Sequence, residues 1–169
     1  YQGNFTFVQI GAPSRSLLKS YSDTINAVDA EVNRINWKFR QKNWQPILFL
    51  KKHHSHEEIM PFYRSAVFCM VTSLHDGMNL VAKEFIASRD QSDGVLILSR
   101  FAGAANELHG AVIVNPYDIE QSADAIKESL EMPIEVQQQK MKQMRRMVMS
   151  HNVYSWASNI LRTMASIQN

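Results

Sequence analysis

The chain has 169 residues, of which 45% are hydrophobic, 20% charged and 9% aromatic, a composition that is typical of globular domains and excludes disordered and collagen-like chains. Its 18 basic and 16 acidic residues leave a formal net charge of +2, which is too balanced to favour nucleic acid or an anionic membrane as the main partner. At roughly 100 to 200 residues per domain, the length predicts a single domain with a sizeable core.

The single cysteine, Cys69, excludes an internal disulfide and offers no zinc-binding pattern, which suits a reducing compartment and predicts a cytoplasmic protein. No apolar run approaches the roughly 18 residues that span a bilayer, and residues 1–7 lack the charged and apolar regions of a signal peptide. We therefore expect a soluble protein. Because the sequence starts without Met on a run that leads directly into a strand, we also expect it to be part of a longer chain.

Short runs rich in β-formers alternate with longer amphipathic runs along the chain. In order, we predict a strand at 5–10, a long helix with an apolar stripe from Leu18 to Phe39, a strand at 46–50, a helix at 57–65, a strand at 67–72, a helix at 80–88, strands at 95–98 and 111–114, and helices at 119–130, 134–149 and 154–164. Strand 67–72 is apolar without alternation, which is typical of a strand covered on both faces. This order predicts an α/β fold built on a parallel sheet.

Polar or glycine-bearing turns fall where the predicted strands end and the helices begin. They occupy residues 11–15, 73–79, 99–104 and 115–118. In an open parallel sheet the carboxyl ends of all strands lie along one edge, and ligands bind in the crevice there. The sequence therefore predicts a ligand site at this edge.

The strongest candidate is the run from Asp76 to Glu84, which leads from a turn into the helix predicted at 80–88. Gly77 allows a ligand to approach the backbone, and the free amides of residues 79–81 at the helix start favour an anion such as phosphate. If most of this span is helical, the two carboxylates lie about 12 Å apart along the axis, so that one can take sugar hydroxyls and the other a ribose across a pyrophosphate. Two interpretations stay open: a sugar-nucleotide site, or an ordinary turn followed by a surface glutamate.

Two other groups of residues are weaker candidates. The small residues of 99–105 favour either a second ligand wall, with free amides at the start of a short helix, or a tight packing turn. A metal is suggested by four histidines, His53, His54, His56 and His75. No HExxH pattern supports it, so we predict no metal site and interpret the first three as part of a polar loop that approaches a base at the ligand edge.

Several runs in the chain are characteristic of one family. They are VQIGAPSR at 8–15, RIN at 34–36, VTSLHDGMNLVAKEF at 71–85, GVLILS at 94–99, FAGAA at 101–105 and VNPYD at 114–118. In this order and spacing they resemble the trehalose-phosphate synthases, retaining glycosyltransferases with two facing Rossmann-like domains, the GT-B architecture. The resemblance implies a Rossmann-like parallel sheet with helices on both faces, a carboxyl-terminal, UDP-glucose-binding domain over 1–169, and an acceptor-binding domain upstream of it.

The resemblance also implies roles for individual residues. Asp76 is implied as the catalytic residue, and the implied donor-binding residues are Gly77, Met78, Asn79, Leu80, Val81, Glu84 and His54. From this resemblance we expect Asp76 and the three residues after it to hold the transferred glucose. We likewise expect the amides of Leu80 and Val81 to meet the diphosphate and Glu84 to hold the ribose hydroxyls. His54 matches the family's base-binding loop by position and not by residue identity, and the arginine and lysine that neutralise the diphosphate are expected upstream of this chain.

The activity implied for the full-length protein is retaining transfer of glucose from UDP-glucose to glucose 6-phosphate, which forms trehalose 6-phosphate. Two alternatives stay open: a glucosylglycerol-phosphate synthase, whose acceptor is glycerol 3-phosphate, and a non-catalytic nucleotide-binding module. The expected partners are UDP-glucose, a phosphorylated acceptor and the missing N-terminal domain, with no cofactor, metal, nucleic acid or membrane. The chain alone is expected to be inactive, because half of the geometry that aligns the acceptor is absent.

Overall fold

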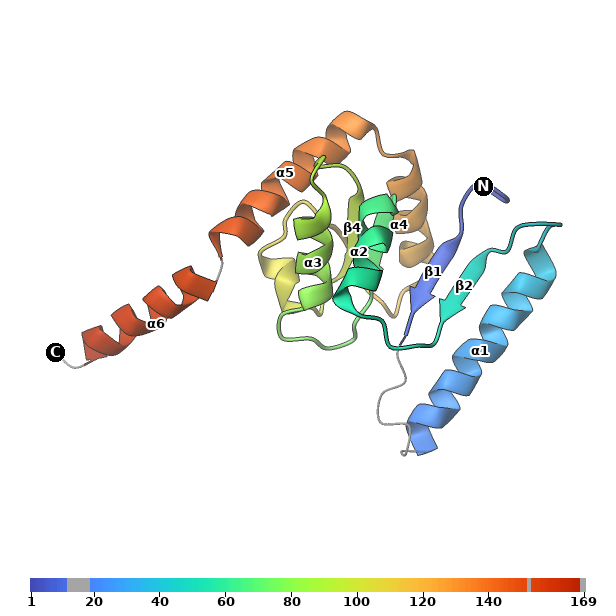
Figure 1. The fold of residues 1–169 in the computed structure, drawn as a ribbon, viewed down its shortest axis with the longest axis horizontal. Coiled ribbons are helices and arrows are strands. Elements are labelled where there is room, and N and C mark those ends of the chain that lie inside the picture. The colour runs from blue at the N-terminus through green and yellow to red at the C-terminus, as the bar shows by residue number, and fades with distance from the viewer. Residues whose placement is uncertain (12–18, 152, 168–169) are drawn as a thin grey trace. The chain divides into compact units, whose positions relative to one another are not determined.

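The computed structural model describes residues 1–11, 19–151 and 153–167 (Figure 1). The chain divides into two compact units, Tyr1–Glu58 and Ile59–Asn169, and each contains its own parallel sheet. The division falls within helix α2 (His56–Ser65). The α/β class with parallel strands is confirmed, and the strands are hydrogen-bonded as two sheets rather than one.

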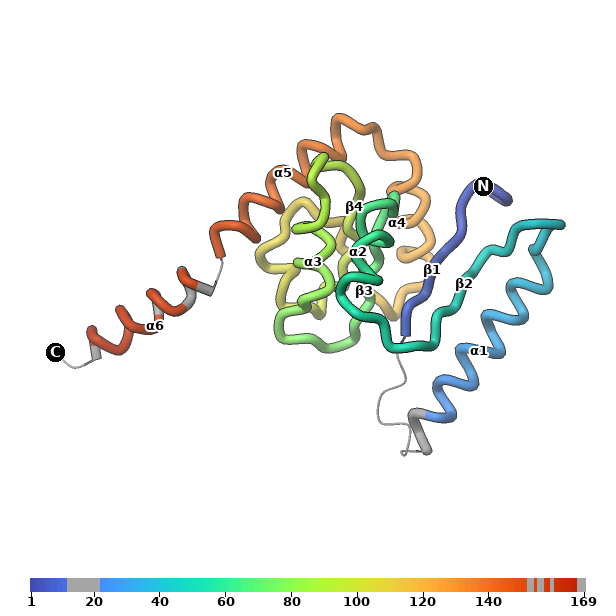
Figure 2. The backbone as a smooth tube through the Cα atoms, in the orientation of Figure 1, coloured from blue at the N-terminus to red at the C-terminus, as the bar shows by residue number. Residues whose placement is uncertain are grey.

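The first unit contains strand β1 (Phe7–Ile10), helix α1 (Lys19–Phe39) and strand β2 (Ile47–Leu50), and its two strands pair in parallel (Figure 2). The side chain of Asn36 fixes α1 to the start of β2. Its Nδ2 donates to the Ile47 carbonyl at 2.9 Å, and its Oδ1 accepts from the Ile47 amide at 3.0 Å. Of the turn predicted at 11–15, only Gly11 belongs to the described residues, and Leu18 also lies outside them.

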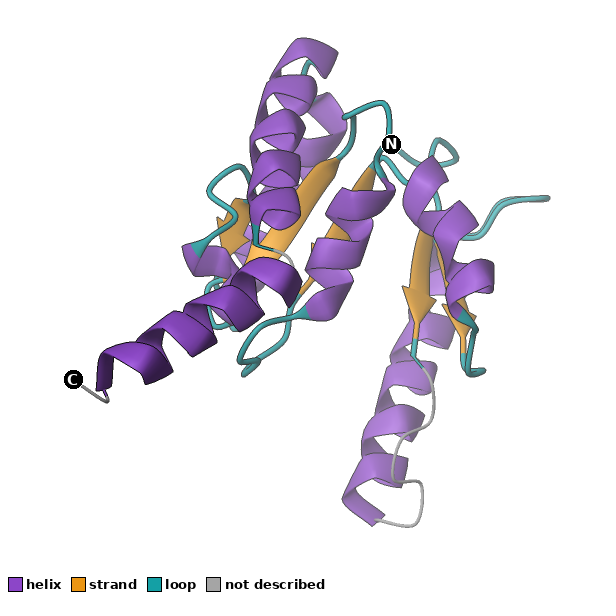
Figure 3. Cartoon of the chain, turned by 60° about the vertical axis from the view of Figure 1, so that its left-hand side comes forward, coloured by secondary structure: helices purple, strands orange, loops and turns teal. Residues whose placement is uncertain are grey.

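The second unit contains strands β3 (Phe68–Val71), β4 (Val95–Ser99) and β5 (Val112–Val114), and helices α3 (Leu80–Ser88), η1 (Gly103–Asn106), α4 (Ile119–Glu131), α5 (Ile134–Ser150) and α6 (Val153–Ile167). The strands form one parallel sheet in the order β3-β4-β5, and Figure 3 shows helices lying against it. Every residue of the central strand β4 is buried, which explains its continuous apolar run.

Alternate residues of β4 belong to two apolar clusters, because successive side chains of a strand point to opposite faces. Leu98 packs in one cluster with Phe85 of α3 and Met141 of α5. Ile97 packs in the other cluster with Ala125 of α4. Helices therefore cover both faces of this sheet, as the resemblance implied.

Helix α2 begins one residue earlier than predicted because a capping box fixes its start. The amide of Ser55 donates to Glu58 Oε2 at 2.8 Å, and the amide of Glu58 donates to Ser55 Oγ at 3.3 Å. These reciprocal bonds satisfy amides that have no partner inside the helix. The sequence of residues 55–58 thus sets where the helix starts.

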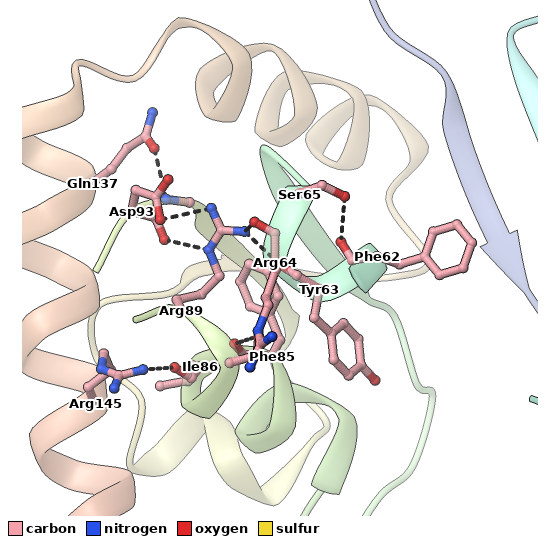
Figure 4. Close-up of polar contacts among 12 residues, drawn as sticks. Phe62, Tyr63, Arg64, Ser65, Phe85, Ile86, Arg89, Asp93, Gln137 and Arg145 are labelled. Atoms are coloured by element: carbon pink, nitrogen blue, oxygen red, sulfur yellow. Dashed lines mark hydrogen bonds and ion pairs between the residues drawn. The ribbon is translucent and has the colours of Figure 1, made fainter. Parts of the chain in front are cut away.

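The other end of α2 is closed by a buried arginine, Arg89, of which 4% is exposed (Figure 4). Its Nη1 donates to the carbonyls of Tyr63, at 2.6 Å, and Arg64, and its Nη2 lies 2.9 Å from Asp93 Oδ1. Carbonyls in the last turn of a helix lack partners within the helix, so a cation there satisfies them. Arg89 therefore holds the end of α2, and with it Tyr63, against the turn that precedes β4.

Candidate functional site

Three loops meet at the carboxyl edge of the sheet β3-β4-β5. They comprise residues 72–79, 100–102 and 115–118. Asp76 forms an isolated parallel bridge with Ala102, which joins the first loop to the second. The ring centroid of Phe101 lies 6.3 Å from that of His75 and 5.9 Å from that of Tyr117, so aromatic contacts join all three loops. The predicted gathering of polar turns at one edge is confirmed for these three.

The carboxylate of Asp76 is held by its own loop. Oδ1 accepts from the amide of Met78 at 3.0 Å, and Oδ2 accepts from Nδ2 of Asn79 at 2.8 Å. These bonds, the Met78 amide first, hold the pKa of Asp76 below its ordinary value, so the group is ionised at neutral pH. Each carboxylate oxygen has a second lone-pair direction, which leaves the half-buried Asp76 able to accept from the hydroxyls of a ligand.

Asn79 is the N-cap of α3 and is almost fully buried. Its Oδ1 accepts from the amide of Ala82 at 2.8 Å, while its Nδ2 also reaches Ser73 Oγ at 3.4 Å. Its φ of 79° lies in the left-handed region, which asparagine adopts more readily than most residues. The side chain is engaged inside the protein, so its contribution to a ligand contact comes through its backbone and through the position it gives Asp76.

The first turn of α3 presents amides that the described part of the chain leaves without acceptors. The amide of Ala82 is capped by Asn79, whereas no acceptor among the described residues bonds those of Leu80 and Val81. Free amides at a helix start favour an anion. The helix begins at Leu80, so only the part of the run from Leu80 to Glu84 is helical, with an axial rise of about 6 Å. The separation of about 12 Å between Asp76 and Glu84, which assumed a mostly helical run, stays a prediction.

Gly77 is not required by the conformation of its own loop. Its φ lies outside the left-handed region, and a β-carbon built on it has no described atom within 4 Å. The neighbouring Met78 is also exposed. The backbone at this point of the loop is therefore open to close approach by another molecule.

Glu84 is half-buried on α3, and the hydroxyl of Tyr63 on α2 donates to its Oε2 at 3.4 Å. Burial raises the pKa of the Tyr63 phenol, so this donor keeps its proton at neutral pH. Tyr63 could not be predicted as a partner of Glu84 from the sequence, because it lies 21 residues before Glu84 and no local pattern links the two. Among the described residues, Glu84 thus has Tyr63 as its hydrogen-bond donor at Oε2, and its other carboxylate oxygen has no such donor.

The second loop differs from the expectation of free amides at its short helix. The amide of Gly103 donates to the carbonyl of Asp76 at 2.8 Å, and the amide of Ala104 donates to the carbonyl of Met78 at 2.9 Å. These two amides are used by the first loop and are not available to a ligand. The segment supports the first loop, which favours the packing interpretation of residues 99–105.

His54 belongs to the first unit, where its Nδ1 lies 3.7 Å from Glu58 Oε2. Its Nε2 is buried and has no hydrogen-bond partner among the described residues. Its predicted role beside the base of a ligand stays a prediction. Across the described ranges no cluster of three or more histidine, cysteine, aspartate or glutamate side chains is arranged to hold a metal ion. Within the same ranges, every helix is too short or too polar to cross a membrane.

Comparisons with known proteins place this geometry in a family. The trehalose-6-phosphate synthase of Enterobacter sp. (strain 638) is 37% identical over 163 residues, which are 96% of this chain and 34% of that protein. The corresponding enzyme of Sodalis glossinidius is 38% identical over 168 residues, or 99% of this chain and 36% of that protein. The chain therefore spans about a third of the length of these relatives.

Solved structures agree with this relationship. The UDP-forming alpha,alpha-trehalose-phosphate synthase of Burkholderia vietnamiensis superposes with a TM-score of 0.92 at 40% identity over 98% of this chain and 38% of that one. A Burkholderia xenovorans enzyme in complex with glucose-6-phosphate superposes with a TM-score of 0.93 at 39% identity, over 97% of this chain and 36% of that one. An E. coli protein bound with UDP-2-fluoro glucose superposes with a TM-score of 0.92 at 36% identity, over 96% of this chain and 36% of that one. The family model of glycosyltransferase family 20 matches residues 1–166. The chain belongs to glycosyltransferase family 20.

Proposed function

We propose that this chain is the donor-binding part of a UDP-forming trehalose-6-phosphate synthase, which moves glucose from UDP-glucose to glucose 6-phosphate with retention of configuration. The strongest support is one arrangement: the amides of Leu80 and Val81, which no acceptor among the described residues bonds, begin a helix directly after a loop that carries the ionised Asp76. An anion-binding helix start beside a hydroxyl-accepting carboxylate suits a sugar diphosphate.

The proposed contacts follow from the chemistry of each group. The Asp76 carboxylate and the backbone of Gly77, Met78 and Asn79 take the hydroxyls of the transferred glucose. The α3 amides take the diphosphate, and Glu84 accepts from the ribose hydroxyls through the oxygen that Tyr63 leaves free. We further propose that His54 contacts the base and that a partner domain supplies the acceptor site.

The helix-start amides also supply the proposed rate enhancement. As UDP departs, negative charge grows on its β-phosphate, and donors aimed at that phosphate bind the transition state more strongly than the ground state. Because the amides of Leu80 and Val81 and the helix dipole take this charge, the proposed reaction needs no metal or other cofactor.

The acceptor proposed is glucose 6-phosphate rather than glycerol 3-phosphate. The relatives compared above are trehalose-6-phosphate synthases, and one was solved with glucose-6-phosphate. In the direct test, a full-length protein that contains this chain is incubated with UDP-glucose and with each acceptor in turn. The product is then identified by mass spectrometry. Trehalose 6-phosphate alone supports the proposal, whereas glucosylglycerol phosphate or UDP-glucose hydrolysis without transfer contradicts it.

Donor binding is tested with Asp76→Asn in the 169-residue chain, with Asp118→Asn as the matched control. Both aspartates lie in loops at the carboxyl edge of the same sheet and accept from backbone amides, at 3.0 Å from Met78 and 2.9 Å from Gln121. We expect Asp76→Asn to lower the affinity for UDP-glucose by about tenfold or more, because a charged hydrogen bond is lost. We expect Asp118→Asn to leave this affinity unchanged. Equal affinities for the two variants and the wild type, measured by titration calorimetry, contradict the assignment of Asp76.

A further inference from the structure

Gly103, at the start of η1, lies directly against the peptide that follows Gly77. A β-carbon built on Gly103 would overlap the carbonyl oxygen of Gly77 and lie 2.8 Å from its carbonyl carbon and 3.4 Å from the amide nitrogen of Met78. These are backbone atoms, so they cannot rotate out of the way as a flexible side chain can. Any residue other than glycine at this position displaces the loop that carries Asp76.

Hydrogen bonds join the two segments on either side of this contact. The Gly103 amide donates to the Asp76 carbonyl at 2.8 Å, the Ala104 amide donates to the Met78 carbonyl at 2.9 Å, and the Asp76 amide donates to the Phe101 carbonyl at 3.3 Å. The loop is thus held at Asp76 and at Met78, on either side of Gly77, by a neighbouring segment. Its position is set by that segment as well as by its own turn.

The supporting segment is itself anchored in the core. Ala102 and Ala104 are 2% and 1% exposed, and the amide of Ala102 donates to the carbonyl of Ser99 at 3.1 Å. Ser99 is the fully buried last residue of β4, and its Oγ accepts from the amide of Phe101 at 3.1 Å. The end of the central strand therefore fixes where Gly103 meets the loop.

Displacement of the Gly77 peptide moves the groups assigned to the donor. The Met78 amide that follows it is the principal hydrogen-bond donor to the Asp76 carboxylate, and Asn79, one residue later, caps α3. We propose that Gly103 is a positioning residue of the donor site. Because glycine has no side chain, the Gly77 peptide can lie directly against η1, and this contact sets the positions of Asp76 and of the first amides of α3. This inference rests on the proposed function and adds a residue to that site.

Gly110 provides a control, because a β-carbon there is also too close to its neighbours, none of which belongs to the loop that carries Asp76. A β-carbon on Gly110 would lie 2.8 Å from the carbonyl oxygen of Lys140 and 2.9 Å from Cγ of Met144, both on α5. Gly103→Ala and Gly110→Ala therefore each bring a β-carbon too close to backbone atoms of the same unit, and the contact at Gly103 is the closer of the two. Only the first one presses on the loop that contains Asp76.

The experiment measures UDP-glucose affinity and thermal unfolding for the wild-type 169-residue chain, Gly103→Ala and Gly110→Ala. We expect both variants to unfold at lower temperature, and only Gly103→Ala to lose affinity, by about tenfold or more, because small misplacements of aligned groups have large effects. A folded Gly103→Ala with wild-type affinity, or an equal loss in both variants, overturns the positioning role. Absence of UDP-glucose binding by the wild type rejects the proposed function, and the inference with it.

A measurement on the wild type covers the case in which Gly103→Ala does not fold. The amide protons of Gly103 and Ala104 bond the loop, so UDP-glucose that orders the loop slows their exchange with deuterated solvent. We expect stronger protection of these two amides in the complex, with the Gly110 amide unchanged. Unaltered exchange at Gly103 and Ala104 in the presence of bound UDP-glucose contradicts the inference.

Discussion

Asn79 donates a 2.8 Å hydrogen bond to the Asp76 carboxylate and, through its other side-chain atom, accepts one of 2.8 Å from the Ala82 amide. A single buried side chain thus joins the loop carboxylate to the first turn of α3. Movement of one part of the candidate site therefore changes the other. This coupling explains why an aspartate, an asparagine and a helix start follow one another at this spacing.

The hydrogen bonds to Asp76 predict a specific dependence of stability on pH. They hold its pKa below the ordinary value of 3.8, so they stabilise the folded state fully above that value and progressively less as pH falls through the lower, folded-state pKa. The difference in free energy of unfolding between wild type and Asp76→Asn is expected to be constant from about pH 5 to 7 and to shrink below about pH 4. Urea unfolding followed by circular dichroism checks this, and a difference that already shrinks near neutral pH contradicts it.

Gly77→Ala should separate ligand contact from folding. The new β-carbon enters space that no described atom occupies, so the fold tolerates it and gains about 0.4 to 1 kcal/mol from a less flexible unfolded chain. A ligand lying on this backbone meets the added methyl group, and the affinity for UDP-glucose is expected to fall. The same preparation serves for urea unfolding and for titration calorimetry. Unchanged affinity would mean that the donor does not approach Gly77.

Glu84→Gln should distinguish a ribose contact from a general charge effect. A carboxylate-to-hydroxyl bond contributes about 1.5 to 3 kcal/mol, so UDP is expected to bind about 10- to 150-fold more weakly. Pyrophosphate, which has no ribose, is expected to change little. Glu107→Gln is the control, because it also removes a carboxylate beside α3. Glu107 pairs at 3.0 Å with Lys83, the residue that precedes Glu84. Equal losses for UDP and pyrophosphate, or a larger loss in the control, would return Glu84 to an ordinary helix residue.

Much of the candidate site can be predicted from local sequence, because local chemistry sets it. The helix predicted at 80–88 has those limits in the structure, since Asn79 is a strong cap and the following residues form helix readily. The apolar run at 95–98 likewise predicts the buried strand β4. In both cases neighbours in the sequence determine the outcome.

The remaining features depend on contacts between distant residues. The hydroxyl of Tyr63 reaches Glu84 across 21 residues, and Gly103 meets Gly77 through the arrangement of two strands. The small residues of 101–105 indicate close packing but not the partner against which they pack. The use of the Gly103 and Ala104 amides by another loop was for the same reason not predictable, and the expectation of free amides there was wrong.

Arg89→Met should destabilise the second unit without acting on the donor directly. The substitution leaves the carbonyls of Tyr63 and Arg64 and the carboxylate of Asp93 without their buried partner. Loss of one member of a buried ionic network costs about 3 to 5 kcal/mol, and we expect a decrease in the free energy of unfolding of that order. Arg100→Met, at an exposed position, is the control and should change it by less than about 0.5 kcal/mol. Equal stability of the two variants would show that Arg89 does not close α2.

In the proposed function the donor binds at the start of α3 and at the loop before it. The most direct measurement is the two-dimensional amide NMR spectrum of the 169-residue chain during titration with UDP-glucose. We expect the largest shifts at Met78, Leu80 and Val81, and expect pyrophosphate to reproduce those of Leu80 and Val81 but not that of Met78. Shifts concentrated elsewhere in the chain, or none at millimolar UDP-glucose, would show that the donor does not bind at the start of α3.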